Sequence, residues 1–152
     1  MNRAKLIDFI IVSNAIEKIM HPPSGEQTDI AASFLELDVI TIPDLERFVD
    51  HFQPGAKLRD QPGMDVRVGN HVPWVGGLHI AKHLEHMLIT CRLGTFTPFW
   101  IHREYETLHP FTDCNGRSGR ILWLWQMERE GRKMAQMGFL QTWYYQSLEV
   151  GK

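Results

Sequence analysis

Cysteine is scarce in this chain of 152 residues. Cys91 and Cys114 are the only two, and they lack the spacing of paired cysteines, so neither a disulfide framework nor a zinc site is indicated. Neither sign of charge dominates: a formal net charge of −2 gives no overall basic surface, so composition does not indicate a nucleic-acid partner. Asp8, Ser13 and Asn14 interrupt the apolar N-terminal run, which is too short to span a membrane, and no small-residue cleavage site follows. These absences predict a cytoplasmic protein.

Strand-like alternation is also nearly absent. It occurs once, where Val66–Val68, a Gly69–Asn70 turn and His71–Val72 predict a small hairpin. The composition, 43% hydrophobic and 22% charged, suits one domain with one core over residues 1–152. Periodicity and terminal Pro, Gly and Thr residues predict helices over residues 4–20, 29–37 (capped by Thr28), 41–52, 77–93, 96–108, 118–132 and 136–148. The predicted fold class is therefore mainly α, a helical bundle with one β-hairpin.

One stretch, LHPFTDCNGRSGRILWLWQM, places two arginines at the start of a predicted helix. The free N–H groups and partial positive charge of a helix N-terminus make Arg117 and Arg120 unfavourable there by about 0.3–1 kcal/mol each. An anion bound at this end would remove the conflict, because arginines three apart share one face and can both donate to phosphate oxygens. Asn115-Gly116 and Gly119 would let the backbone approach such an anion closely.

Two further residues complete a reactive set. Asp113 would repel a phosphate unless a divalent cation bridged the two, and magnesium commonly occupies such a position. His109 lies four residues before Asp113, where a neutral imidazole can accept a proton from an attacking hydroxyl. A candidate base, a candidate metal ligand and two candidate phosphate-binding arginines thus lie within twelve residues. This combination indicates a site for phosphoryl-type transfer.

The segment from His109 to Arg120, HPFTDCNGRSGR, closely resembles the signature of the Fic family, HPFx(D/E)GNGRxxR. The resemblance covers about residues 55–132, including Leu58-Arg59 and the hairpin. It implies a Fic-type helical bundle that transfers AMP from ATP, with magnesium, to a Ser, Thr or Tyr hydroxyl of a target protein.

The resemblance also implies a role for each matching residue. His109 would deprotonate the target hydroxyl, and Asp113 would hold magnesium on the α- and β-phosphates. The anion site would be formed by Cys114, Asn115, Gly116, Arg117, Gly119 and Arg120, with Arg117 on the phosphates and Arg120 orienting the γ-phosphate. Cys114 departs from the pattern, since the family usually has glycine there. A Cys in a left-handed conformation would cost about 1 kcal/mol.

In Fic proteins the hairpin acts as a flap that pairs with an extended segment of the target. By this resemblance Val66, Arg67, Val68, Gly69 and Asn70 would bind the target through main-chain hydrogen bonds. The alternative is a hairpin that only covers the core.

The N-terminal helix, residues 1–20, contains a possible inhibitor. At about 100° per residue, Leu6, Ile10, Ser13, Glu17 and Met20 share one stripe, so Glu17 is expected on an apolar face and in need of a partner. The segment from Ser13 to Glu17 resembles the (S/T)xxxE(G/N) inhibitory motif of Fic proteins, although Lys18 stands where Gly or Asn is usual. There the glutamate binds the second signature arginine and blocks the γ-phosphate. Ser13 and Glu17 are therefore the predicted inhibitory residues, and Arg120 is the predicted partner of Glu17.

Other functions use the same residues. Glu17 could orient water to remove AMP from a modified protein, and the related death-on-curing toxins tolerate a small residue at the position of Cys114 and phosphorylate their target. A non-catalytic nucleotide-binding module is a further alternative, and an exposed helix face could form a homodimer. A nucleophilic Cys114 is disfavoured because no histidine–thiol pairing is evident.

Two remaining patterns have ordinary structural explanations. His79, His83 and His86 have a spacing that could bind a transition metal, but no carboxylate or cysteine completes the set and an exposed face is expected. The aromatic residues that could stack on a base, but that we expect in the core, are Trp123, Trp125, Trp143, Tyr144 and Tyr145.

Overall fold

The computed structural model describes residues 1–131, which contain helices and no strand. The helices are α1 (Arg3–Ile16), α2 (Gly25–Leu35), α3 (Ile42–Phe52), α4 (Leu78–Leu93), α5 (Pro98–Leu108) and α6 (Asn115–Arg129). The predicted class, mainly α, is confirmed for this part of the chain. The expected helix over 136–148 and the aromatic residues Trp143, Tyr144 and Tyr145 lie outside the described residues.

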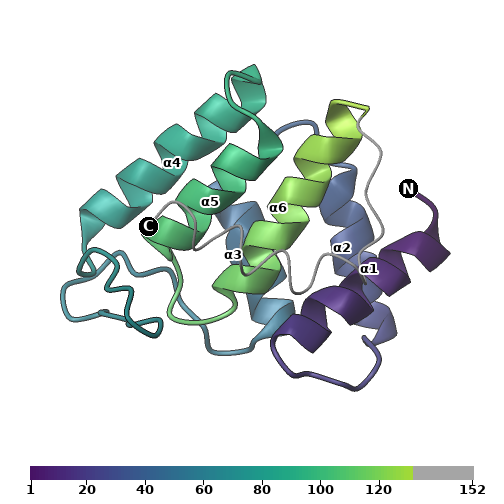
Figure 1. Cartoon of the computed structure of the whole chain (residues 1–152), viewed down its shortest axis with the longest axis horizontal. Helices are drawn as coiled ribbons and strands as arrows, with labels where there is room; N and C mark the ends of the chain where they lie inside the picture. The colour runs from purple at the N-terminus through teal and green to yellow at the C-terminus, as the bar shows by residue number, and fades with distance from the viewer. Residues whose placement is uncertain (132–152) are drawn as a thin grey trace.

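Helix α6 is central, because it packs against α1, α2, α3 and α5. Figure 1 shows α4 and α5 side by side on one side of α6, α1 and α2 on the other, and α3 passing behind. Ile121, Leu122, Leu124 and Trp125 are all buried, although they point in different directions around α6. A helix that is apolar on every side is expected only where neighbours surround it.

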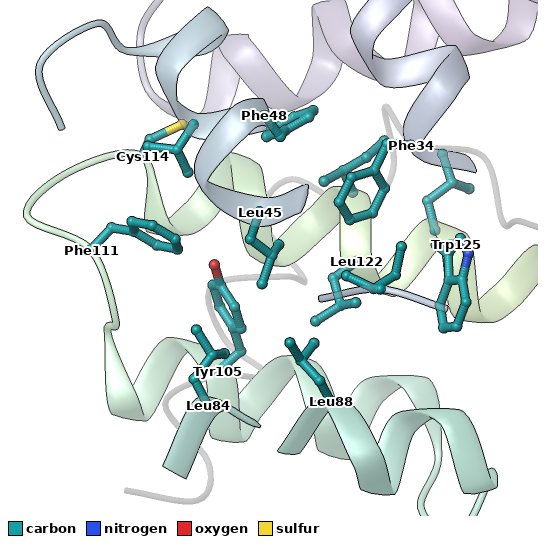
Figure 2. Packing of buried hydrophobic residues seen from close by; sticks show 14 of the residues in the cluster. Phe34, Leu45, Phe48, Leu84, Leu88, Tyr105, Phe111, Cys114, Leu122 and Trp125 are labelled. Atoms are coloured by element: carbon teal, nitrogen blue, oxygen red, sulfur yellow. The ribbon is translucent and has the colours of Figure 1, made fainter. Parts of the chain in front are cut away.

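The core fills the space between these helices. Figure 2 shows Phe34, Leu45, Tyr105 and Leu122 converging from α2, α3, α5 and α6. The Tyr105 hydroxyl lies 2.8 Å from Ser118 Oγ, so this contact satisfies two buried polar groups where α5 crosses α6. The first turn of α6, which belongs to the signature-like segment, is thus anchored to the buried face of α5.

Two helix starts differ from the sequence prediction. Helix α2 begins at Gly25, because Ser24 accepts from the Gln27 N–H while Gln27 Oε1 accepts from the Ser24 N–H, a capping box. The prediction that Thr28 caps this helix was wrong: Thr28 lies inside it and donates its hydroxyl to Ser24 O. Helix α6 begins at Asn115 rather than Ser118, so the Asn-Gly-Arg turn is already helical.

The predicted hairpin forms only in part. Val68 and His71 exchange both backbone hydrogen bonds around the Gly69–Asn70 turn, which is a single isolated bridge and not a pair of strands. Pro73, which has no N–H to donate, follows directly, and this limits how far pairing can extend. We call residues 66–72 the flap; His71 Nε2 lies 2.9 Å from Thr107 O, which ties the flap to α5.

None of the described helices has the length and apolar character needed to cross a membrane.

Candidate functional site

The N-terminus of α6 is an open set of backbone donors. Cys114 takes a left-handed conformation, φ 68°, and provides no side-chain cap. The N–H groups of Asn115, Gly116 and Arg117 have no acceptor among residues 1–131. Three N–H groups at the positive end of a helix form a favourable site for an anion. The left-handed conformation explains why a glycine would suit position 114 better than cysteine.

A half-open pocket of about 510 Å³ lies over this helix end. Four separate parts of the chain meet there: the segment after α1, the end of α3, the flap, and the signature-like segment. Its lining residues are Glu17, Ile19, Gln53, Val66, Arg67, Val68, His109, Thr112, Asp113, Cys114, Asn115, Gly116 and Arg117. Among the predicted site residues, Ser13, Gly69, Asn70, Gly119 and Arg120 do not line the pocket.

His109 is the C-cap of α5, in a left-handed conformation with φ 51°. Its Nδ1 lies 3.3 Å from Glu106 O, and a proton on Nδ1 would leave Nε2 as the basic nitrogen of a neutral ring. Arg59 holds this backbone turn: its Nε donates to His109 O at 2.7 Å and its Nη2 donates to Leu108 O at 2.9 Å.

Arg59 also joins the flap to this turn. Its Nη1 donates to Met64 O and Trp74 O, on either side of the flap, and the residue is fully buried. One buried cation therefore fixes both the base of the flap and the backbone of His109 through four carbonyl groups. Arg59 lies within the stretch that resembles the Fic family, but no role for it was predicted from the sequence.

Asp113 lies at the mouth of the pocket and is exposed. One carboxylate oxygen accepts from the Cys114 N–H at 2.6 Å, and the other has no hydrogen bond or ion pair within the described part of the chain. An exposed carboxylate with one oxygen anchored and one open suits a divalent cation bound together with a phosphate.

The side chain of Asn115 holds the loop rather than facing a ligand. Its amide accepts from the Phe111 N–H and donates to Phe111 O, both at 2.8 Å. The side chain of Asn115 thus fixes the turn between His109 and α6, while its backbone N–H faces the helix end without an acceptor within residues 1–131. Gly119 likewise serves packing, because a Cβ there would come within 2.9 Å of Glu106 Oε1 and Tyr105 Cδ1 on α5.

Arg117 is buried at the bottom of the pocket. Its Nη1 donates to Phe52 O at 2.9 Å and its Nη2 donates to Gln53 Oε1 at 2.8 Å, both from the end of α3. Its buried Nε has no acceptor, and no carboxylate of residues 1–131 forms an ion pair with it. A buried cation with only neutral partners leaves positive charge for an anion to compensate.

Glu17 and Arg120 form the predicted pair. Glu17 Oε1 lies 2.7 Å from Arg120 Nη2, and Ser13 accepts from Arg120 through its hydroxyl (2.8 Å) and its carbonyl (3.0 Å). Gly116 makes room for the pair, because a Cβ there would overlap Glu17 Oε1 and lie within 2.9 Å of Arg120 Nη1.

The expected setting of Glu17 was wrong. Helix α1 ends at Ile16, so Glu17 is its C-cap at the edge of the pocket, half-exposed, and not in the middle of an apolar face. Lys18 adopts φ 62°, its N–H bonds Ala15 O, and the Ile19 N–H bonds Asn14 O. These are the bonds of a Schellman motif, which usually has glycine at the position of Lys18. Met20, expected on the same stripe, is exposed.

Two pKa shifts bear on the chemistry. Burial raises the pKa of the Cys114 thiol to about 12, which keeps the thiol protonated and argues against a nucleophilic role. Burial, together with repulsion from Arg120, lowers the pKa of His102 to about 3. His102 is therefore neutral, and its 3.9 Å separation from Glu106 is not an ion pair.

The other candidate patterns lie away from the pocket. No group of three metal-binding side chains occurs within residues 1–131. His79 and His83 contact the ring of Trp74, and His79 Nε2 lies 2.7 Å from Val75 O. Trp125 is buried and donates its indole N–H to Leu37 O, as expected of a core residue.

Sequence reasoning missed Gln53 and Ile19 as lining residues. Ile19 follows directly after the predicted inhibitory motif, and its proximity to Glu17 was the available signal. Gln53 has no local signal, because it is 64 residues away from Arg117 in the sequence and meets it only through the packing of α3 on α6.

Comparison with known proteins adds no relative. The chain matches no family model and no curated protein.

Proposed function

We propose that this chain is a magnesium-dependent protein adenylyltransferase of the Fic type that is inhibited by its own Glu17. The proposal depends above all on Arg117, a buried cation without a carboxylate partner in the described residues, in a pocket shared with His109 and Asp113. It is supported by the resemblance of His109–Arg120 to the family signature.

The phosphates of ATP would bind at the start of α6. The backbone N–H groups of Asn115, Gly116 and Arg117 and the side-chain Nε–H of Arg117 have no acceptor within residues 1–131, so an anion would satisfy groups that are otherwise unpaired. Asp113, with one open oxygen, would hold magnesium, which would neutralise charge on the phosphates. The donor set fits both groups.

The transfer itself needs a base. The target hydroxyl would attack the α-phosphorus, the new O–P bond would form as the bond to the bridging oxygen breaks, and pyrophosphate would leave. The hydroxyl proton would pass to Nε2 of His109. Contacts with Arg59 fix the backbone that presents this imidazole, which limits the motion that would misplace the base.

The flap would position the target. Val66 and Arg67 line the pocket, and their backbone N–H and C=O groups have no partner among residues 1–131. An extended segment of the target could pair with these groups and thereby place its hydroxyl at His109.

Glu17 would inhibit by occupying Arg120, because the γ-phosphate cannot bind this guanidinium while the carboxylate does. Hydrolytic removal of AMP is a second candidate function, favoured by one observation. The Glu17 carboxylate lines the same pocket as His109, where it could activate a water molecule.

One experiment separates these functions. Purified wild type, Glu17→Gly and His109→Ala are incubated with magnesium and ATP labelled on the α-phosphate, with and without a cell lysate. The control is His86→Ala, which removes an exposed histidine outside the pocket. Adenylyl transfer predicts labelled protein that increases in Glu17→Gly, is lost in His109→Ala, and is unchanged in His86→Ala.

Other outcomes would point elsewhere. Label from γ-labelled ATP alone would indicate a phosphotransferase. Release of AMP from a modified protein that requires Glu17 would indicate hydrolysis. No label from either ATP in any variant would refute the proposal and favour a non-catalytic binding module.

A further inference from the structure

The end of α3 places Gln53 beside the pocket. The helix ends at Phe52, and the Gln53 N–H bonds Val49 O at 2.7 Å, which fixes the backbone of the C-cap. Pro54 and Gly55, the latter with φ 92°, then turn the chain away from the helix. Gln53 is half-buried and lines the pocket, so its side chain is available both to protein and to ligand.

The hydrogen-bond acceptors of Arg117, like those of the buried Arg59, are all uncharged. A carboxylate is the strongest partner for a guanidinium, since it provides charge as well as geometry. Here the acceptors are a backbone carbonyl, Phe52 O, and a neutral amide, Gln53 Oε1, at 2.9 and 2.8 Å. By contrast, Arg120 three residues along has a carboxylate at 2.7 Å. The two arginines of the segment are thus paired differently, one neutralised and one not.

We infer that Gln53 is a positioning residue for a polyphosphate anion: its amide orients the guanidinium of Arg117 without cancelling the charge that the anion needs. The inference rests on the proposed function and specifies how its anion site works. A glutamate at position 53 has nearly the same shape but would pair with Arg117 and repel phosphate. At position 53, glutamate should therefore favour the stability of the fold, whereas glutamine should favour anion binding.

This conflict yields a test that a purely structural role would fail. The 152-residue chain carrying Glu17→Gly, which removes the carboxylate partner of Arg120, is titrated calorimetrically with tripolyphosphate in the presence of magnesium, and its melting temperature is measured. The same measurements are made with Gln53→Glu, Gln53→Met and, as a matched control, Gln61→Glu. Gln61 is exposed and outside the pocket lining, so the control repeats the charge change away from Arg117.

We expect Gln53→Glu to weaken tripolyphosphate binding by about tenfold or more while its melting temperature stays the same or rises. Gln53→Met should lower the melting temperature, because Arg117 Nη2 loses its acceptor, and should weaken binding less than Gln53→Glu does. Gln61→Glu should match the parent in both measurements.

Each contrary result has a distinct meaning. If the parent binds tripolyphosphate and Gln53→Glu binds it equally well, Gln53 does not preserve charge at Arg117 and the inference is refuted. If Gln53→Glu loses binding together with a fall in melting temperature like that of Gln53→Met, the role is structural only. If the parent itself does not bind tripolyphosphate, the proposed anion site is refuted and the inference with it.

Discussion

The contact between Glu17 and Arg120 gives the sharpest prediction. The two side chains approach to 2.7 Å, with relative exposures of 38% for Glu17 and 4% for Arg120. The change to make is Glu17→Ala, which removes the carboxylate but keeps a residue that the C-cap conformation of φ −90° accepts.

The size of the effect follows from the exposure of the pair. Two unit charges about 4 Å apart attract by about 4 kcal/mol at an effective dielectric constant near 20. Because Glu17 is partly solvated and Arg120 also binds Ser13, the net contribution should be nearer 1–2 kcal/mol. If the γ-phosphate must displace Glu17, removal of the carboxylate should lower the KM for ATP about 5–30-fold. The same change should lower the free energy of unfolding by about 1 kcal/mol, since Arg120 stays buried with fewer acceptors.

The assay is the rate of adenylylation as a function of ATP concentration, paired with urea denaturation. Glu26→Ala is the control, because Glu26 is also an exposed glutamate with a basic partner, His51 Nε2 at 3.2 Å, but lies outside the pocket. A KM for ATP in Glu17→Ala equal to that of Glu26→Ala would show that the contact does not oppose nucleotide binding.

Three further predictions concern stability, each measured by urea denaturation. Lys18→Gly should raise the free energy of unfolding by about 1 kcal/mol, because glycine adopts the left-handed φ of 62° at this position without strain. The control Lys82→Gly, at an exposed position within α4, should lower the free energy of unfolding by about 1 kcal/mol. If both changes shift the free energy of unfolding in the same direction, the Schellman assignment is contradicted. Arg59→Met should lower the free energy of unfolding by about 3 kcal/mol or more, since four carbonyl groups lose their donor. The control Arg67→Met, at an exposed position, should lower it by less than about 0.5 kcal/mol. Similar losses in the two variants would argue against Arg59 as the link between the flap and α5. His102 has a pKa of about 3 in the folded protein, below its ordinary value of 6.5. As the pH falls from 6.5 toward 3, this histidine therefore takes up a proton in the unfolded chain but not in the folded one. The free energy of unfolding should decline over this range, by about 2 kcal/mol at pH 5. His102→Gln should lack that share of the decline, and an unchanged pH slope would refute the assignment.

The sequence predicted helices well where their signals are local. Thr41 and Pro43 marked the start of α3, and Leu108 and Leu93 were correctly expected as the ends of α5 and α4. The start of α2 was missed although Ser24 and Gln27 form a capping box, because Thr28 offered a competing cap. The start of α6 was placed too late because Cys114, left-handed and without a capping side chain, does not look like an N-cap.

The candidate site divides in the same way. His109, Asp113 and Arg117 lie within nine residues, so the spacing alone brought them to one helix end. The segment from Ser13 to Glu17 predicted, through the resemblance, that Arg120 is the partner of Glu17. It did not predict the exposure of Glu17, because the position at which α1 ends depends on Lys18 in a left-handed conformation. The flap was predicted as a hairpin, whereas Pro73 and the contact of His71 with α5 limit it to one bridge.

The sequence by itself determined a mainly helical chain and a cluster of histidine, carboxylate and arginine at one helix start, since periodicity and short spacings depend only on neighbouring residues. Only the tertiary structure decided that Arg117, unlike Arg120, has no carboxylate partner within the described residues. Arg117 meets Gln53 and Phe52 from α3, and Arg120 meets Glu17 and Ser13 from α1. Those pairs are remote in sequence, and they form because packing against α6 brings the ends of α1 and α3 to its buried first turn.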